Sequence, residues 1–326
     1  MDIPLLSVCL ITYNHVNYIK QAIDGVLMQK VDFAWELIIA DDFSTDGTRE
    51  IVLEYKNKYP DLIKLILQEK NVGAAQNFID LITAPKSKYI AYFEGDDYWT
   101  DPLKLQKQVD FLETNPDFVM CHTQAQAVDY KGEILKESYI SLCKDYSRDE
   151  LIQDQDALLP TLTCCFRSNC LYLPEEFYFC KNGDTFMFSI LGCSGKSKYL
   201  GDIKPSAYRL HSSGVWSSLS HTQKSLSSIN TYYWMSRYYS RIGKNEYSQS
   251  LQNKYKNITL SLINVPLRSC TQDLLRDIWI VWQKYYYRSD NGFNFLFYAN
   301  FMQLFIIRLL YVYIRDFIKL NIFSFR

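Results

Sequence analysis

Several features that would place this 326-residue chain in a special class are missing from its sequence. No run of about 18 uncharged apolar residues occurs, so no transmembrane span is expected. The nine cysteines form no C-x-x-C pair, which favours reduced cysteines in a cytoplasmic protein over a disulfide framework or a zinc site. A net charge of −1 leaves no basic footprint for nucleic acid. The opening residues carry no basic segment, so no signal peptide is expected either.

What is present indicates a packed protein with two different parts. Hydrophobic residues make up 48% of the chain and charged residues 22%, which suits a globular core. From about residue 217 glycine becomes scarce, and tyrosine, lysine and glutamine recur at helical spacing. We therefore expect a first domain over residues 1–216 and a helical region over 217–326.

Strand-like and helix-like segments alternate in the first half. The patterns predict strands near residues 5–13, 35–40, 62–67 and from 88, and helices near 18–29, 49–59, 71–84 and 103–113. This alternation is typical of an α/β fold, Rossmann-like, with a mostly parallel sheet flanked by helices. Further strands are expected at 118–128, 162–167, 171–173 and 192–199, with a turn at 129–133 and a helix at 183–191. In the C-terminal extension, helices are expected at 220–243, 246–264, 272–287 and 295–320.

Polar clusters follow three of the predicted parallel strands. They are Thr12 to Asn14, Asp41 with Asp42, and Glu94 to Asp97. Ligands of such sheets bind at the carboxyl ends of the strands, so these clusters are expected to converge on one crevice. The convergence is the main reason to expect a site here.

The third cluster follows a short apolar run and crowds three carboxylates, Glu94, Asp96 and Asp97, around Gly95. Like charges this close raise each other's pKa unless a cation lies among them. A divalent ion with oxygen ligands, sharing its coordination with water and phosphate, would relieve the repulsion. A solvated acidic turn before a helix is the alternative.

These segments resemble the inverting family 2 glycosyltransferases of the GT-A fold. The match is carried by Ser7 to Asn14 as the opening strand, Trp35 to Thr48 as the second strand and nucleotide loop, and Glu94 to Asp97 at the metal motif. Gly183-Asp184 resembles the segment with the catalytic base, and Tyr208 to His211 a later site segment. Glu94 stands where the family usually has aspartate. The Q-x-x-R-W motif of processive synthases is missing.

The resemblance implies a non-processive enzyme that moves one sugar from a nucleotide-sugar, by family habit a UDP-sugar, to an acceptor hydroxyl with inversion. It implies Mn²⁺ or Mg²⁺ as cofactor and a glycan or lipid-linked acceptor, as in cell-envelope polysaccharide biosynthesis. By this likeness Asp184 is the base, Asp97 and His211 are metal ligands, and the nucleotide-sugar is bound by Thr12, Asn14, Asp41, Asp42, Asp96, Arg167 and Arg209.

Each assignment has a structural alternative. Asp97 could be a charge at a helix N-terminus, Asp41 and Asp42 could be turn formers, and Asp184 could be a helix N-cap. A single histidine such as His211 is often structural. His15, His122 and His221 have no supporting pattern.

The C-terminal helix, near residues 295–320, carries Arg308, Arg315 and Lys319 on one narrow stripe of a largely apolar surface. A broad apolar face with basic residues suits a helix lying peripherally on the cytoplasmic face of a membrane. Packing on the catalytic domain, or across a homodimer, is the alternative.

Two other functions compete with sugar transfer. A nucleotidyltransferase on a related fold would need a glycine-rich opening to hold a triphosphate, and Ser7 to Asn14 contains no glycine. A catalytically silent binding or scaffold protein would have no need of Asp42, Asp96, Asp97 and Asp184 together.

Overall fold

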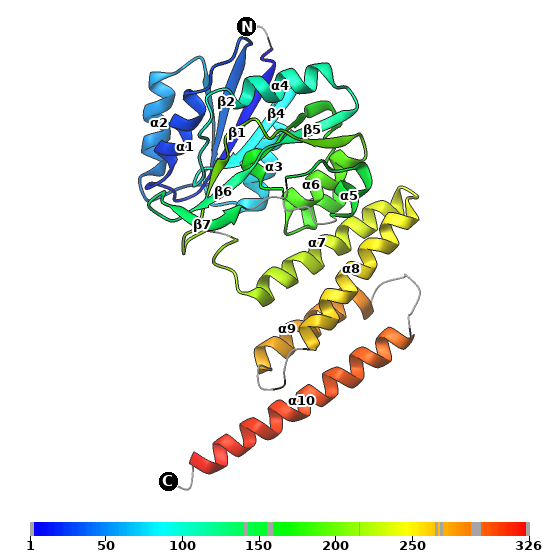
Figure 1. The fold of residues 1–326 in the computed structure, drawn as a ribbon. Helices are drawn as coiled ribbons and strands as arrows, with labels where there is room; N and C mark the ends of the chain where they lie inside the picture. The colour runs from blue at the N-terminus through cyan, green and yellow to red at the C-terminus, as the bar shows by residue number, and fades with distance from the viewer. Residues whose placement is uncertain are drawn as a thin grey trace. The chain divides into compact units, whose positions relative to one another are not determined.

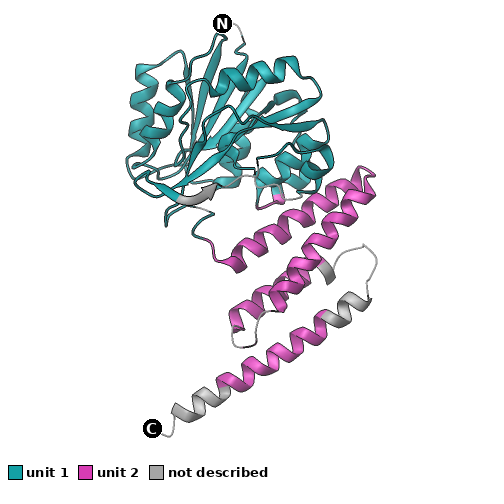
Figure 2. Ribbon diagram, in the orientation of Figure 1, with its two compact units in different colours: residues 1–178, 182–218 teal, residues 179–181, 219–326 magenta. Residues whose placement is uncertain are grey.

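The computed structural model describes residues 3–139, 143–154, 159–214, 216–264, 267, 270–287 and 295–323. The chain divides into two compact units, coloured separately in Figure 2. The first comprises residues 1–178 and 182–218, and the second comprises residues 179–181 and 219–326. The short segment 179–181 belongs with the helical unit, which the sequence pattern did not indicate.

A seven-stranded sheet in the order β3-β2-β1-β4-β8-β5-β9 forms the centre of the first unit (Figure 1). Its strands are β1 (Leu6–Thr12), β2 (Trp35–Asp41), β3 (Ile63–Leu67), β4 (Tyr89–Glu94), β5 (Phe118–His122), β8 (Cys165–Arg167) and β9 (Lys196–Tyr199). Only β8 runs antiparallel to its neighbours, so the predicted α/β fold with a mostly parallel sheet is confirmed.

Helices cover both faces of this sheet because residues on either face of its strands are apolar. They are α1 (Ile19–Leu27), α2 (Thr48–Lys58), α3 (Ala74–Thr83), α4 (Lys104–Thr114), α5 (Arg148–Gln153) and α6 (Gly183–Gly192). Alternate residues of β1, such as Leu6 and Val8, lie in one buried cluster with residues of α1, α2 and α4. On the opposite face, Cys9 points to the carbonyl of Leu81 in α3. Strands buried on both sides read as continuous apolar runs, which is why the sequence revealed them.

Three strand predictions need correction. The segment predicted as one strand over 118–128 is split, because the buried polar pair Thr123 and Gln124 interrupts it before β6 (Ala125–Val128). That strand joins β10 (Ser206–Arg209) and β7 (Ile134–Tyr139) in a second sheet, and a turn over 129–133 links β6 to β7 as predicted. Residues 161–163 form a 3₁₀ turn before the short β8, and 171–173 are not a strand.

The second unit contains helices α7 (His221–Arg241), α8 (Asn245–Ile263), α9 (Gln272–Trp282) and α10 (Phe295–Phe323), with a π-helical turn, Gln283–Tyr287, after α9. Its core mixes aliphatic and aromatic side chains, and the rings of Trp282 and Phe301 stack with centroids 3.9 Å apart. No helix among the described residues is both long and apolar enough to span a bilayer.

The two arginines of the stripe on α10 point inward. Arg308 is 7% exposed and donates to the side chain of Asn264 at 3.1 Å, and Arg315 donates to the carbonyl of Cys270 at 2.6 Å. The opposite face exposes Ile306, Leu310, Tyr313 and Ile314, among other apolar residues. Both arginines are thus bonded within the helical unit, and the exposed face is apolar rather than basic.

Candidate active site

The carboxyl ends of β1, β2 and β4 lie level with one another. Thr12 pairs with Asp41 and Ile11 pairs with Glu94 in the parallel register. Beyond the paired residues, Asp42 N donates to the carbonyl of Thr12 at 3.0 Å, and Gly95 N donates to the carbonyl of Ile11 at 2.8 Å. The three polar clusters predicted from the sequence therefore meet at one edge of the sheet.

The loops at this edge approach too closely for a side chain at position 95. A Cβ on Gly95 would lie 2.9 Å from Thr12 Oγ1 and 3.1 Å from both His15 Nδ1 and the side chain of Ile19. Glycine therefore lets the acidic loop after β4 lie directly against the loop after β1.

Hydrogen bonds join the loops after β1 and β2. Asn14 adopts a left-handed backbone with φ of 54°, its N–H donates to Ser44 Oγ at 2.9 Å, and its Oδ1 accepts from Thr45 N at 3.0 Å. Asn14 tolerates this conformation better than most residues. The side chain and the N–H of Asn14 thus both fix this loop to the loop after β2.

Asp41 and Asp42 are both buried but are held differently. Asp41 Oδ2 accepts from Arg49 Nε at 2.6 Å and from Ser44 N at 3.2 Å, while Oδ1 has no hydrogen-bond partner in the described part of the chain. Asp42 accepts from the backbone N–H groups of Val72 and Gly73. Asp41 Oδ1 is thus a buried acceptor without a partner among the described residues, whereas Asp42 secures the loop before α3.

Asp96 forms a cluster with two histidines. Its Oδ2 lies 2.9 Å from His211 Nε2 and 3.8 Å from His15 Nε2. Desolvation acts to raise the pKa of Asp96, but the hydrogen bond from His211 and the charges of both histidines outweigh it, so the pKa is lowered. Desolvation lowers the pKa of His15 against the opposing charge of Asp96. His15 directly follows Asn14, and this position in the sequence could have identified it as a site residue.

Asp97 is 3% exposed, and its Oδ1 accepts from Arg209 N at 2.8 Å. Desolvation, together with the negative charges of Asp96 and Glu94, raises the pKa of Asp97 well above its usual range. A cation beside these carboxylates would reverse that effect.

The guanidinium of Arg209 is occupied within the protein. It donates to the carbonyls of Asp96, Asp129 and Tyr130 and to Gln21 Oε1, at 2.7 to 3.2 Å. The guanidinium of Arg209, which was predicted to bind the nucleotide-sugar, instead fixes the backbone on which Asp96 and Asp97 are carried.

Glu94 has one methylene more than aspartate, and its carboxylate bonds to another segment of the chain. Its Oε2 accepts from Thr161 Oγ1 at 2.6 Å, which ties β4 to the 3₁₀ turn over residues 161–163. Desolvation, opposed by the Thr161 hydrogen bond and reinforced by the charges of Asp96 and Asp184, raises the pKa of Glu94 to about 7. Thr161 was not recognised from the sequence, because nothing local marks it.

Asp184 lies in the first turn of α6, and its Oδ1 accepts from Thr185 N at 2.7 Å. The N-cap residue of α6 is Asn182, so the alternative in which Asp184 is a helix N-cap is wrong. The side chain keeps solvent access, yet enough protein surrounds the carboxyl that desolvation raises its pKa. Its charge also acts on Glu94, which places the two carboxylates in the same neighbourhood.

Arg167 is the one predicted site residue that lies elsewhere. It pairs with Tyr89, the first residue of β4, and therefore sits at the opposite edge of the sheet. Its guanidinium donates to the carbonyls of Leu112, Asn115 and Phe118. The antiparallel direction of β8 was not visible in the sequence, and a phosphate contact by Arg167 at the site is ruled out by this placement.

The donor set at the acidic loop fits a divalent cation. Asp96 and Asp97 offer carboxylate oxygens and His211 an imidazole nitrogen, a mixture that Mn²⁺ accepts. Among the described residues no group of three such side chains is already arranged around one point. An ion here would therefore take part of its coordination from water and ligand phosphate, as Mg²⁺ commonly does.

Comparison with protein families matches residues 7–177 to "Glycosyl transferase family 2". An uncharacterized protein of Mycobacterium tuberculosis is 35% identical over 218 residues, which cover 65% of this chain and 61% of the relative. The putative teichuronic acid biosynthesis glycosyltransferase TuaG of Bacillus subtilis is 38% identical over 109 residues, covering 33% of this chain and 42% of the relative. The chain thus spans about three fifths or less of the length of these relatives.

Solved structures share the fold. S. aureus TarS 1–349 in complex with UDP superposes with a TM-score of 0.58 at 18% identity, covering 85% of this chain and 80% of that one. The mannosyltransferase PcManGT from Pyrobaculum calidifontis, in complex with GDP-Man and Mn²⁺, gives 0.53 at 12% identity, covering 97% and 88%.

Proposed function

The chain belongs to glycosyltransferase family 2, and on that premise we propose that it transfers one sugar from a nucleotide-sugar to an acceptor hydroxyl, with inversion. The observation that carries the proposal is the convergence at one sheet edge of the Asp41–Asp42 loop with the Asp96–His211 pair. We propose a UDP-sugar as donor, which the UDP in the TarS structure supports by analogy of fold.

The loops after β1 and β2 would hold the nucleotide. Thr12 would line the pocket at the end of β1, and Asn14 would contribute its backbone carbonyl, since its N–H and side chain bind Ser44 and Thr45. Asp41 would accept a hydrogen bond from the base through its open Oδ1, and Asp42 would keep the loop before α3 in place.

The acidic loop would hold the diphosphate end. Asp97, Asp96 and His211 would bind Mn²⁺ or Mg²⁺, and a bound ion would neutralise negative charge that develops on the leaving diphosphate. Arg209 keeps this loop in register through its bond to the carbonyl of Asp96.

Asp184 would take the proton of the acceptor hydroxyl as that oxygen attacks the anomeric carbon. Its raised pKa improves its match to a base working near neutral pH. The carboxylate keeps solvent access, as a group that meets an incoming acceptor requires.

A donor screen tests the proposal directly. We expect UDP-sugars with Mn²⁺ to raise the melting temperature and, with a suitable acceptor, to release nucleoside diphosphate. Ligand at 100 times its Kd stabilises a protein by about 2.7 kcal/mol, which a melting curve resolves. Pyrophosphate release from a sugar phosphate and a nucleoside triphosphate would instead identify a nucleotidyltransferase. No stabilisation by any nucleotide-sugar would leave a silent binding protein.

For the acceptor we propose a lipid-linked or cell-surface glycan, reached from a peripheral position on the cytoplasmic face of the membrane. The exposed apolar residues of α10, among them Ile306, Leu310 and Ile314, support this proposal. A homodimer through the same face is the competing arrangement.

Vesicle binding separates the two arrangements. Because Arg308 and Arg315 are bonded inside the unit, we expect sedimentation with vesicles that persists at high salt. Changing Ile306, Leu310 and Ile314 together to Gln should abolish it while UDP binding is unchanged. If the wild-type chain ignores vesicles and the triple variant instead converts a dimer to a monomer, the membrane arrangement is wrong.

A further inference from the structure

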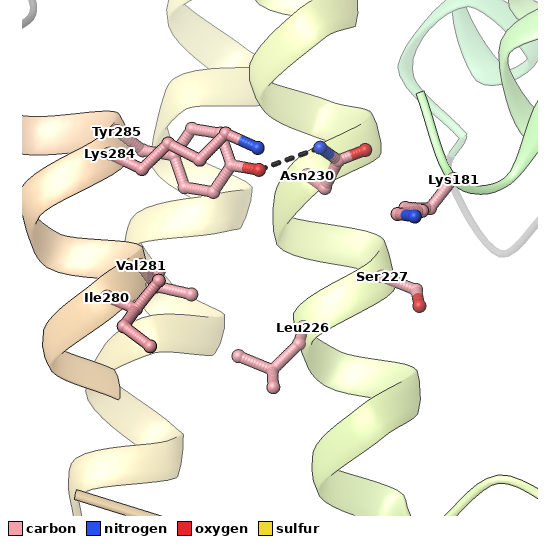
Figure 3. Close-up of a pocket in the computed structure, with 8 residues that line it drawn as sticks. All are labelled: Lys181, Leu226, Ser227, Asn230, Ile280, Val281, Lys284 and Tyr285. Carbon is pink, nitrogen blue, oxygen red and sulfur yellow. Dashed lines mark hydrogen bonds between the residues drawn. The ribbon is translucent and has the colours of Figure 1, made fainter. Parts of the chain in front are cut away.

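A pocket in the helical unit has the features of a binding site (Figure 3). It has a volume of about 200 Å³ and lies between α7, α9 and the π-helical turn, with Lys181 from segment 179–181 at one side. It is smaller than pockets that enclose a whole drug-sized ligand, so it suits the end of a longer molecule.

The pocket contains an unusual buried amide. Asn230 lies within α7, is 4% exposed, and donates through Nδ2 to the hydroxyl of Tyr285 at 2.7 Å. Its Oδ1 has no hydrogen-bond partner among the described residues. Asparagine is a poor helix former, and a buried acceptor without a partner carries a free-energy cost. A ligand hydroxyl that donates to Oδ1 would remove that cost.

Cationic and hydroxyl donors face the same space. Lys181 and Lys284 both line the pocket, and both are exposed enough to keep their ammonium groups hydrated. Tyr285 accepts the bond from Asn230, so its own O–H remains to donate. Two ammonium groups and a hydroxyl donor are a chemistry that recognises phosphate oxygens.

The remaining wall is hydrocarbon. Leu226 on α7 and Ile280 and Val281 on α9 line the lower half of the pocket in Figure 3, away from the amide. Ile280 is 51% exposed, so the apolar wall continues to the surface. An alkyl chain could follow this wall outwards from a group held at Asn230.

We propose that this pocket binds the phosphate end of an amphiphile. The phosphate oxygens accept from Lys181, Lys284 and Tyr285, a hydroxyl on or beside the phosphate donates to Asn230 Oδ1, and the first carbons of the chain lie on Leu226 and Ile280. The inference does not depend on the transferase reaction, because every residue in it lies in the helical unit.

The test is calorimetric titration of the full chain with n-hexyl phosphate, with n-hexanol and inorganic phosphate as partial probes. We expect n-hexyl phosphate to bind more tightly than either. Lys284→Gln and Lys181→Gln should each weaken it about tenfold. Asn230→Asp, which places a negative charge beside the phosphate, should abolish it. Lys254→Gln, on α8 outside the pocket, is the matched control and should bind as the wild type does.

Four results would overturn the proposal. They are no binding of n-hexyl phosphate to the wild type, equal binding of n-hexanol, equal binding of inorganic phosphate, and unchanged binding by the two lysine variants. The lysine variants decide the case even if Asn230→Asp melts early, because exposed lysines can be replaced with little effect on folding.

Discussion

Asp97→Asn is expected to retain the fold and lose most of its transferase activity. The amide keeps an oxygen for Arg209 N, so the hydrogen bond that anchors this loop at 2.8 Å survives while the negative charge is removed. Stabilisation of charge by a metal ion is worth several kcal/mol, so we expect the transfer rate to fall roughly a hundredfold to a thousandfold. The stabilisation that Mn²⁺ adds to nucleotide binding should fall with it.

Two further variants serve as a comparison and a control for this measurement. Asp97→Ala removes the charge and the hydrogen bond together, and should melt earlier than Asp97→Asn because the bond to Arg209 contributes about 1 kcal/mol. Asp202→Asn, at a surface carboxylate in the same unit with a side chain 71% exposed, should behave as the wild type does. Full transfer activity in excess chelator, or in Asp97→Asn, would refute the metal role of this residue.

The order of strands and helices up to β4 could be predicted because the information is local. Each strand there is a short apolar run, each helix has apolar residues at helical spacing, and parallel strands end at one edge whatever their order in the sheet. It could therefore be predicted that the loops carrying Asp41 and Asp96 lie at the same end of the sheet, although they come from distant segments. The orientation of each side chain could not, because that depends on contacts between segments.

Three residues illustrate the limit. Arg209 belongs to the site, yet its guanidinium binds backbone carbonyls from two loops that only the folded chain brings to it. Arg167 looked equivalent in the sequence, but its three-residue strand runs antiparallel and carries it to the other edge. His15 had no pattern of its own and gains significance only from its 3.8 Å approach to Asp96.

The prediction for the C-terminal helix was limited in the same way. The spacing of Arg308 and Arg315 predicted that they share a stripe, which they do. Whether that stripe faces solvent depends on its partners, here Asn264 and the carbonyl of Cys270 on other segments. A buried arginine that satisfies carbonyl groups is indistinguishable, in sequence, from one that faces a membrane.

Asp184→Asn should affect the chemical step and leave the donor site unchanged. The variant keeps an oxygen for Thr185 N, which lies 2.7 Å from Oδ1, so the start of α6 should remain intact. Desolvation raises the pKa of Asp184. Its ionisation therefore opposes folding: the stability it contributes is full below the unfolded pKa and is lost as pH rises through the folded pKa. A neutral side chain should then melt no earlier than the wild type at neutral pH.

We expect the transfer rate of Asp184→Asn to fall by about 10²–10⁴-fold, the usual worth of a general base, with near-native affinity for the nucleotide. The pH profile gives an independent readout. A base must be ionised to accept a proton, so wild-type kcat/KM should rise with pH through an apparent pKa above the usual aspartate range, and this acid limb should vanish in the variant. Turnover close to wild type, with the limb intact, would show that Asp184 only supports the first turn of α6 and that another group takes the proton.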